Sequence, residues 1–128
     1  MPIPGRLFNA SMLVAVAMGP GAASAEPTTP GGAISVAQVN QMLDQAPTNG
    51  IARQVLTAYL AGVGETVGVM IATGGGATCQ QPFSLTAQDV RAALGTAGNG
   101  LQAGAVAATP LIVHDMLNRA QCSRRQGD

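Results

Sequence analysis

The chain has 128 residues, six arginines, no lysine, six acidic residues and a formal net charge of zero. This length limits it to one domain, and the lack of a basic run excludes a nucleic-acid-binding face, because neutralising phosphates requires clustered positive charge. With 47 % hydrophobic and 9 % charged residues, charge-driven disorder is excluded as well.

Residues 1–25 have the organisation of a secretory signal peptide. Arg6 precedes the apolar run 12–18, a Gly-Pro break follows, and residues 23–25 form a small-residue cleavage motif. The apolar run is shorter than the roughly 20 residues that a membrane span requires. We therefore predict cleavage after Ala25, a periplasmic location, and a flexible leader over residues 26–34.

Cys79 and Cys122 are the only cysteines of the chain. Since an exported protein meets an oxidising environment, we predict that they form a disulfide, which stabilises the fold by roughly 4 kcal/mol. A nucleophilic role for Cys79 is the weaker alternative, because no histidine flanks it and a second thiol is available.

The first predicted helix covers residues 35–46. Ser35 and Gln38 have the spacing of a capping box, and apolar residues follow at helical intervals as far as Ala46. The sequence Pro-Thr-Asn-Gly at 47–50 is typical of a turn, so we expect the helix to end there.

A second helix is predicted for residues 51–72, with one apolar face. That face consists of Ala52, Val55, Leu56, Tyr59, Val63, Thr66, Val67 and Met70. The segment is hydrophobic enough to raise the question of a membrane span. Because Arg53 and Glu65 would be costly in lipid, we predict a soluble helix instead.

The opposite face of this helix has small side chains for a solvated surface. It consists of Gln54, Thr57, Ala61, Gly64, Glu65 and Gly68. Such a row permits close approach of another helix, from this chain or from a second copy in a homodimer, although a general bias towards glycine explains it more simply. Glu65 is interpreted as a solvent-facing charge or, alternatively, as an interface contact.

A glycine-rich loop is predicted for residues 73–78. Gly74, Gly75 and Gly76 do not form a phosphate cradle, because such a loop ends in a lysine and this chain has none. They are, however, accessible candidates for contact with a partner protein.

Two more helices are predicted towards the C-terminus. Thr86 and Asp89 have the spacing of an N-cap and its acidic N3 residue, which opens a helix through Leu94. Residues 101–108 fit either a short helix or a packed loop. Thr109 followed by Pro110 predicts the start of the last helix, with a buried stripe of Val113, Met116, Leu117 and Ala120. The expected fold is all-α, with four to five helices closed by one disulfide and a C-terminal tail at 123–128.

No constellation of residues specifies a reaction. His114 is the only histidine, and Asp115 points about 100° away from it on a helix, so the two do not form an oriented pair. The acidic residues lie on separate predicted elements, which gives no metal-ligand spacing. We therefore expect no catalytic, metal or cofactor site, and a protein that is not an enzyme.

Several segments together resemble a known family. These are Tyr59-Leu60-Ala61-Gly62-Val63 in the long helix, the Cys79-Gln80-Gln81-Pro82 loop, the helix start at 85–90, and a last helix that ends in Cys122. Over residues 35–122 the chain resembles the Rap/Tai family of type VI secretion immunity proteins. The resemblance implies a periplasmic, mostly helical inhibitor that binds a secreted peptidoglycan amidase and blocks its cleft.

A second hypothesis is a periplasmic acid-stress chaperone similar to the HdeA proteins, which are also helical, exported and held by one disulfide. Its mechanism would be acid-driven loosening that exposes apolar surface to client proteins. The few titrating groups of this chain would make the acid trigger weak.

Overall fold

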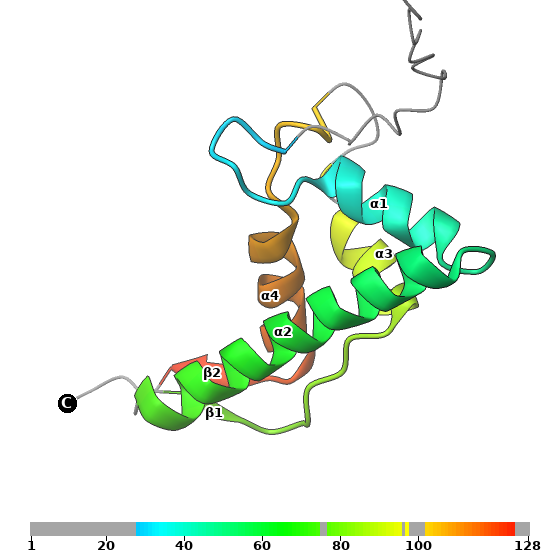
Figure 1. Ribbon diagram of the computed structural model, residues 1–128. Coiled ribbons are helices and arrows are strands. Elements are labelled where there is room, and N and C mark those ends of the chain that lie inside the picture. The colour runs from blue at the N-terminus through cyan, green and yellow to red at the C-terminus, as the bar shows by residue number, and fades with distance from the viewer. Residues whose placement is uncertain (1–27, 75–76, 96, 98–101, 125–128) are drawn as a thin grey trace, which may run out of the picture.

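The structure of the protein is a computed structural model, and it describes residues 28–74, 77–95, 97 and 102–124. These residues form four helices and two short strands, in the order α1 (Val36–Gln45), α2 (Gly50–Gly74), β1 (Ala77–Cys79), α3 (Ala87–Gly95), α4 (Ala108–Arg119) and β2 (Cys122–Arg124) (Figure 1). The predicted signal peptide and most of the tail lie outside the described residues.

The fold is mostly helical, as predicted, but it is not purely α-helical. β1 and β2 pair antiparallel and place Cys79 directly opposite Cys122. The predicted disulfide between these two cysteines is confirmed, with their Cα atoms 3.9 Å apart. Strands of three residues are too short to show an alternating pattern, which is why the sequence did not reveal them. The sheet and the disulfide together join the segment after α2 to the end of α4.

The hydrophobic core lies where α1, α3 and α4 meet the N-terminal half of α2 (Figure 1). Aliphatic side chains fill it: Val36, Val39, Leu43, Leu56, Leu60, Val90, Leu94, Ala108 and Ile112. Tyr59 and Phe83, the aromatic residues expected in the mature protein, are only half-buried. The core therefore depends on close packing of small and branched side chains.

The start of α1 confirms the predicted capping box. Ser35 Oγ accepts a hydrogen bond from the backbone N–H of Gln38 at 3.1 Å, and Gln38 Oε1 accepts one from the backbone N–H of Ser35 at 2.8 Å. The backbone N–H of Val36 also donates to the carbonyl of Val106, and that of Ala108 donates to the carbonyl of Ile34. Because these bonds connect the start of α1 to the start of α4, both helices begin at one shared point.

The chain before α1 and the chain before α4 both form turns where the structure describes them. Within the predicted leader, the side chain of Thr29 is buried and its hydroxyl accepts a hydrogen bond from the N–H of Ala33. Residues 102–106 are turns and a bend. Of the two alternatives for residues 101–108, a short helix or a packed loop, the described residues before α4 therefore match the packed loop.

The predicted N-cap of α4 is wrong. The helix begins at Ala108, its N-cap is Ala107, and no side chain caps it. Thr109 lies inside the first turn, where its hydroxyl is 2.8 Å from the hydroxyl of Tyr59 on α2. The tertiary hydrogen bond with a half-buried tyrosine takes precedence over local capping chemistry.

The buried stripe of α4 matches the predicted one at Met116 and Ala120 only. Ala108, Ile112, Met116 and Ala120 are buried at steps of four residues. Val113 and Leu117, which were predicted for this stripe, are only half-buried at its edge. Apolar residues flank the stripe of Met116 around the helix axis, so the sequence pattern alone does not determine which side of the helix faces the core.

The core-facing side of α2 matches the predicted one at Ala52, Leu56 and Val67, which are buried, but it is rotated from the predicted side elsewhere. Leu60 is buried, whereas Val55 and Met70 are 50 % and 65 % exposed. The helix is apolar around most of its circumference, so its periodicity does not distinguish the side that faces the core. It also extends to Gly74, so the predicted loop 73–78 begins as helix and ends as strand β1.

Candidate functional site

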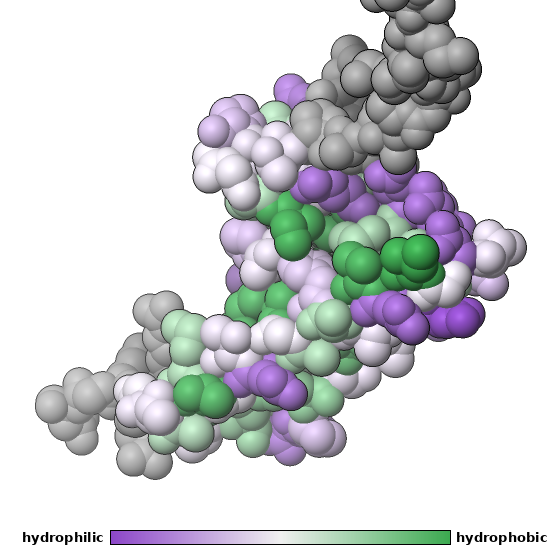
Figure 2. Space-filling view, viewed as in Figure 1, coloured by the Kyte–Doolittle hydropathy of each residue, from purple (hydrophilic) through white to green (hydrophobic). Residues whose placement is uncertain are grey.

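The most exposed apolar surface of the described residues lies on α2. Among the described residues, four large hydrophobic side chains are exposed, and all four belong to this helix: Ile51, Val55, Val69 and Met70. Figure 2 shows apolar surface near both ends of α2. By length and composition, α2 is also the one helix among the described residues that is long and apolar enough to cross a membrane, and 17 % of its most apolar window is buried. Exposed apolar surface of this extent is typical of sites that contact another protein or a membrane.

A groove of about 710 Å³, here called the larger groove, runs along the side of α2 that faces α3. Leu43, Ala46, Pro47, Arg53, Leu56, Thr57, Leu60, Ala61, Gly64, Phe83, Leu85, Ala87, Arg91 and Met116 line it. The groove is open and mainly apolar, and its volume is within the range of protein ligand pockets.

Local structure explains how this groove forms. Asn49 caps α2, because its Oδ1 accepts hydrogen bonds from the N–H groups of Ile51 and Ala52 at 3.0 and 3.2 Å. The turn between α1 and α2 contributes Ala46 and Pro47 to the lining of the groove. Farther along, Leu85 lies near Gly64, where a Cβ would be 3.9 Å from Leu85 Cδ1. A small residue at 64 thus allows the segment before α3 to pass close to α2.

Charged side chains lie on the rim of the larger groove. Arg91 Nη1 is 3.0 Å from Asp44 Oδ1, with both side chains about half-exposed or more, so this ion pair joins α3 to α1 at the surface. Arg53 is exposed in the first turns of α2. The groove therefore combines an apolar floor with two guanidinium groups, one of them already paired with a carboxylate.

A smaller groove of about 510 Å³ lies between α2 and α4, lined by Ala58, Tyr59, Gly62, Val63, Thr66, Val67, Met70, Thr109 and Val113. The hydrogen bond between Tyr59 and Thr109 is at its polar side. Burial raises the pKa of the Tyr59 phenol, and the hydrogen bond between Tyr59 and Thr109 partly offsets this effect. The phenol is therefore neutral at physiological pH.

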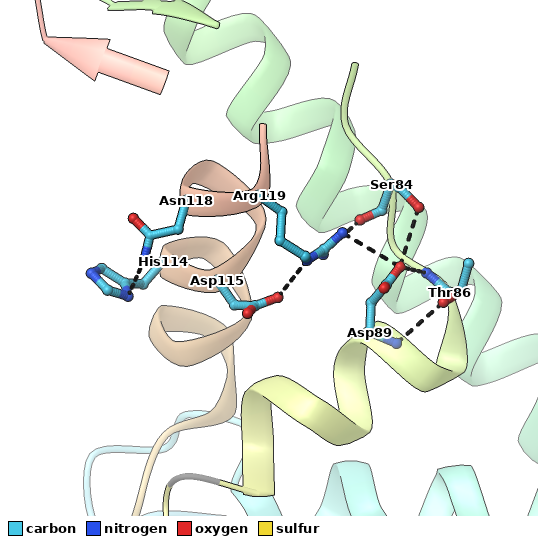
Figure 3. Close-up of polar contacts among 7 residues, drawn as sticks. All are labelled: Ser84, Thr86, Asp89, His114, Asp115, Asn118 and Arg119. Carbon is cyan, nitrogen blue, oxygen red and sulfur yellow. Dashed lines mark hydrogen bonds and ion pairs between the residues drawn. The ribbon is translucent and has the colours of Figure 1, made fainter. Parts of the chain in front are cut away.

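A polar network holds the segment before α3 against α4 (Figure 3). Asp89 Oδ2 accepts hydrogen bonds from the backbone N–H of Thr86 at 2.9 Å and from the hydroxyl of Ser84 at 3.1 Å. The N–H of Asp89 donates to Thr86 Oγ1 at 3.1 Å, which confirms the predicted cap of α3. These hydrogen bonds, led by the backbone bond, hold the pKa of Asp89 below its ordinary value.

Arg119 completes this network from α4. Its Nε donates to Asp115 Oδ2 at 2.7 Å, and its Nη2 donates to the carbonyl of Ser84 at 2.8 Å. Asp115 therefore pairs with Arg119 and not with His114, whose Nδ1 lies 3.2 Å from the amide nitrogen of Asn118. Among the residues with described placement, no group of three or more His, Cys, Asp and Glu side chains is arranged to hold a metal ion.

The structure separates the residues predicted as partner contacts. Glu65 is exposed on α2 and lines neither groove, and Gly74 is the last residue of that helix. Gly75 and Gly76 lie outside the described residues. Sequence reasoning missed the larger groove, because its lining comes from four helices and the segment between β1 and α3. Only the small residues Thr57, Ala61 and Gly64, which were noted as one face of the helix, indicated it.

Comparison with known proteins adds no assignment: no protein-family model matches the chain, and no curated protein or solved structure matches it. The candidate site is therefore defined by geometry alone, as an apolar groove with a cationic rim beside an exposed apolar helix.

Proposed function

We propose that the protein is a non-enzymatic periplasmic binding protein, which acts as an immunity protein and inhibits a secreted peptidoglycan amidase. The larger groove is the observation that supports this function most. It is open along α2, its floor is apolar, and Arg53 and Arg91 lie on its rim. A protruding segment of a partner with an apolar side chain and a flanking carboxylate matches that surface.

The composition of the groove is suited to recognition of a protein. Arginine and aromatic side chains are enriched among the residues that dominate binding energy at protein interfaces. The groove is lined by Phe83 and by two arginines. The Cys79–Cys122 disulfide and the Asp89–Arg119 network fix both ends of the segment that carries Phe83. Its position is therefore set before a partner binds, which lowers the entropic cost of association.

The test is binding to, and inhibition of, the peptidoglycan amidases that the same genome encodes for secretion. The variant Ala61→Trp fills the groove from an exposed position of α2, so it should weaken binding at least tenfold without unfolding the protein. Ala92→Trp adds the same side chain at an exposed position of α3 outside both grooves and serves as the control. Equal binding by the wild type and Ala61→Trp would exclude the groove as the contact surface, and no binding to any such amidase would exclude the immunity role.

An acid-stress chaperone is the second candidate function, and the low pKa of Asp89 favours it. The carboxylate of Asp89 caps α3 and pairs with Arg119 of α4, so its protonation would weaken a contact within α3 and a contact between α3 and α4 at the same time. A chaperone of this kind protects client proteins at about pH 2 to 3 and loses near-ultraviolet circular dichroism there. Unchanged tertiary packing at that pH would remove this candidate.

A further inference from the structure

We propose that α2 is also the interface of a homodimer, in which two copies of the chain pack antiparallel along the outer side of this helix. The interface is an exposed row of residues, here called the outer row, which consists of Ile51, Val55, Ala58, Gly62, Glu65 and Val69. It is distinct from the larger groove, so the proposal goes beyond the proposed function and does not depend on it.

The spacing of the outer row is that of a helix-packing seam. Its positions follow one another at alternating steps of four and three residues, the repeat that keeps side chains on one stripe facing a second helix. All six residues are exposed, and Ile51, Val55 and Val69 are 74 %, 50 % and 61 % exposed. Such a stripe on a surface helix is unfavourable in water unless another apolar surface covers it.

The order of residues in the outer row fits a second copy of itself. A two-fold axis at the level of Leu60 pairs Ile51 with Val69 of the second copy and Ala58 with Gly62 of the second copy. Large side chains therefore meet at the two ends and small ones at the centre, which allows the helix axes to approach closely. A row that is complementary to itself is the property that a two-fold interface requires.

Charge selects the antiparallel orientation. In a parallel pair the two Glu65 carboxylates would lie opposite each other, an unfavourable contact of like charges. In the antiparallel pair Glu65 lies opposite Val55 at the edge of the row, and the two carboxylates are about 15 Å apart along the axis. The carboxylates can then remain in water while the apolar residues are covered.

The area is sufficient for a reversible dimer. Half of the surface of a helix with the length of α2 amounts to about 600 Å² per copy, or about 1,200 Å² in total. This is at the lower end of the range for specific interfaces, so we expect a reversible dimer and not a permanent one. The larger groove stays open in both copies because it lies on the other side of α2.

Sedimentation of the full chain tests the proposal, with Gly62→Leu as the informative variant. A Cβ at Gly62 meets no atom within 4 Å, so the monomer tolerates the new side chain, whereas the dimer has no room for it opposite Ala58. We expect the wild type to dimerise and Gly62→Leu to raise the dissociation constant at least tenfold. Gly68→Leu is the control, since a Cβ at Gly68 also meets nothing within 4 Å and this residue is outside the row. A wild type that is monomeric at about 100 µM, or equal dimerisation by Gly62→Leu, would overturn the proposal.

A charge exchange tests the orientation. Ile51→Lys and Val69→Glu should each abolish the dimer, and the double variant should restore it, because only the antiparallel arrangement brings the new lysine of one copy to the new glutamate of the other. Failure of the double variant to dimerise would contradict the antiparallel arrangement. Flotation with phosphatidylglycerol vesicles tests whether lipid, and not a second copy, covers the outer row. A monomer that floats with the vesicles would assign the outer row to lipid and overturn the dimer.

Discussion

The carboxylate of Asp89 on α3 lies 3.5 Å from the guanidinium of Arg119 on α4, and the same carboxylate oxygen caps the first turn of α3. One side chain therefore performs a local and a tertiary role. Since the ion pair is partly exposed, charge attraction contributes little to stability. Most of the stabilising effect of the Asp89 side chain therefore comes from the hydrogen bonds of the cap.

Replacement of Asp89 by asparagine should lower the free energy of unfolding by about 1 kcal/mol at neutral pH, because the amide accepts these hydrogen bonds less well than a carboxylate. Urea denaturation measures this difference. Asp44→Asn removes a carboxylate from the exposed pair with Arg91 and should have an effect below about 0.5 kcal/mol. Equal effects of the two variants would contradict the special role of Asp89.

The lowered pKa of Asp89 also predicts how stability depends on pH. A carboxyl group whose pKa is lower in the folded state stabilises the fold above its unfolded pKa, near 4, and this contribution is lost as the pH falls through the folded pKa. The wild type should therefore lose stability below about pH 4, and Asp89→Asn should show a shallower decline over the same interval. Parallel pH profiles of the two proteins would contradict this assignment.

The hydrogen bond between Tyr59 and Thr109 should be visible as a coupling between the two positions. Tyr59→Phe and Thr109→Val each remove one partner, and a double-mutant cycle should give a coupling energy of about 1 kcal/mol. A capping role for Thr109 would instead give an effect that is independent of residue 59. Additivity of the two variants would therefore favour the capping interpretation over the observed contact.

Reduction of the Cys79–Cys122 disulfide should lower stability by about 4 kcal/mol, because it releases a loop of 43 residues in the unfolded chain. The double variant Cys79→Ala, Cys122→Ala should unfold at a correspondingly lower urea concentration and should not respond to a reducing agent. Unchanged stability on reduction would show that the helices hold the fold without the covalent link.

Ile112 is fully buried among the helices, so Ile112→Ala should destabilise the protein by about 3 kcal/mol through lost burial and the cavity left behind. Met70→Ala is the matched control, since this side chain is 65 % exposed, and its effect should be below about 0.5 kcal/mol. Similar losses for both would contradict the placement of the core.

The parts of the fold that local chemistry determines were predictable from the sequence. The capping boxes at Ser35 and Thr86 marked the starts of two helices correctly, because a capping box is complete within four residues. Thr109 shows the opposite case: its local signal was strong, but its hydroxyl bonds to Tyr59, fifty positions away in the chain. The two cysteines were paired correctly because the chain holds no other cysteine.

The candidate site was less predictable, for two physical reasons. The rotation of α2 about its axis depends on which of its apolar sides the other helices cover, and a helix that is apolar all around does not encode this in its period. The larger groove also needs Leu85 to lie beside Gly64, a contact between segments that are separated by the sheet and its disulfide. Sequence patterns show the small residues of the groove, but not the segment that faces them.

The most direct test of the proposed function is a titration of a secreted peptidoglycan amidase from the same genome with this protein, with hydrolysis of peptidoglycan as the readout. The proposed function predicts that activity falls to zero at about one chain per enzyme, as tight inhibitors behave, and that Ala61→Trp requires at least tenfold more protein. Full amidase activity at a large excess of the wild-type chain, for every such enzyme, would contradict it.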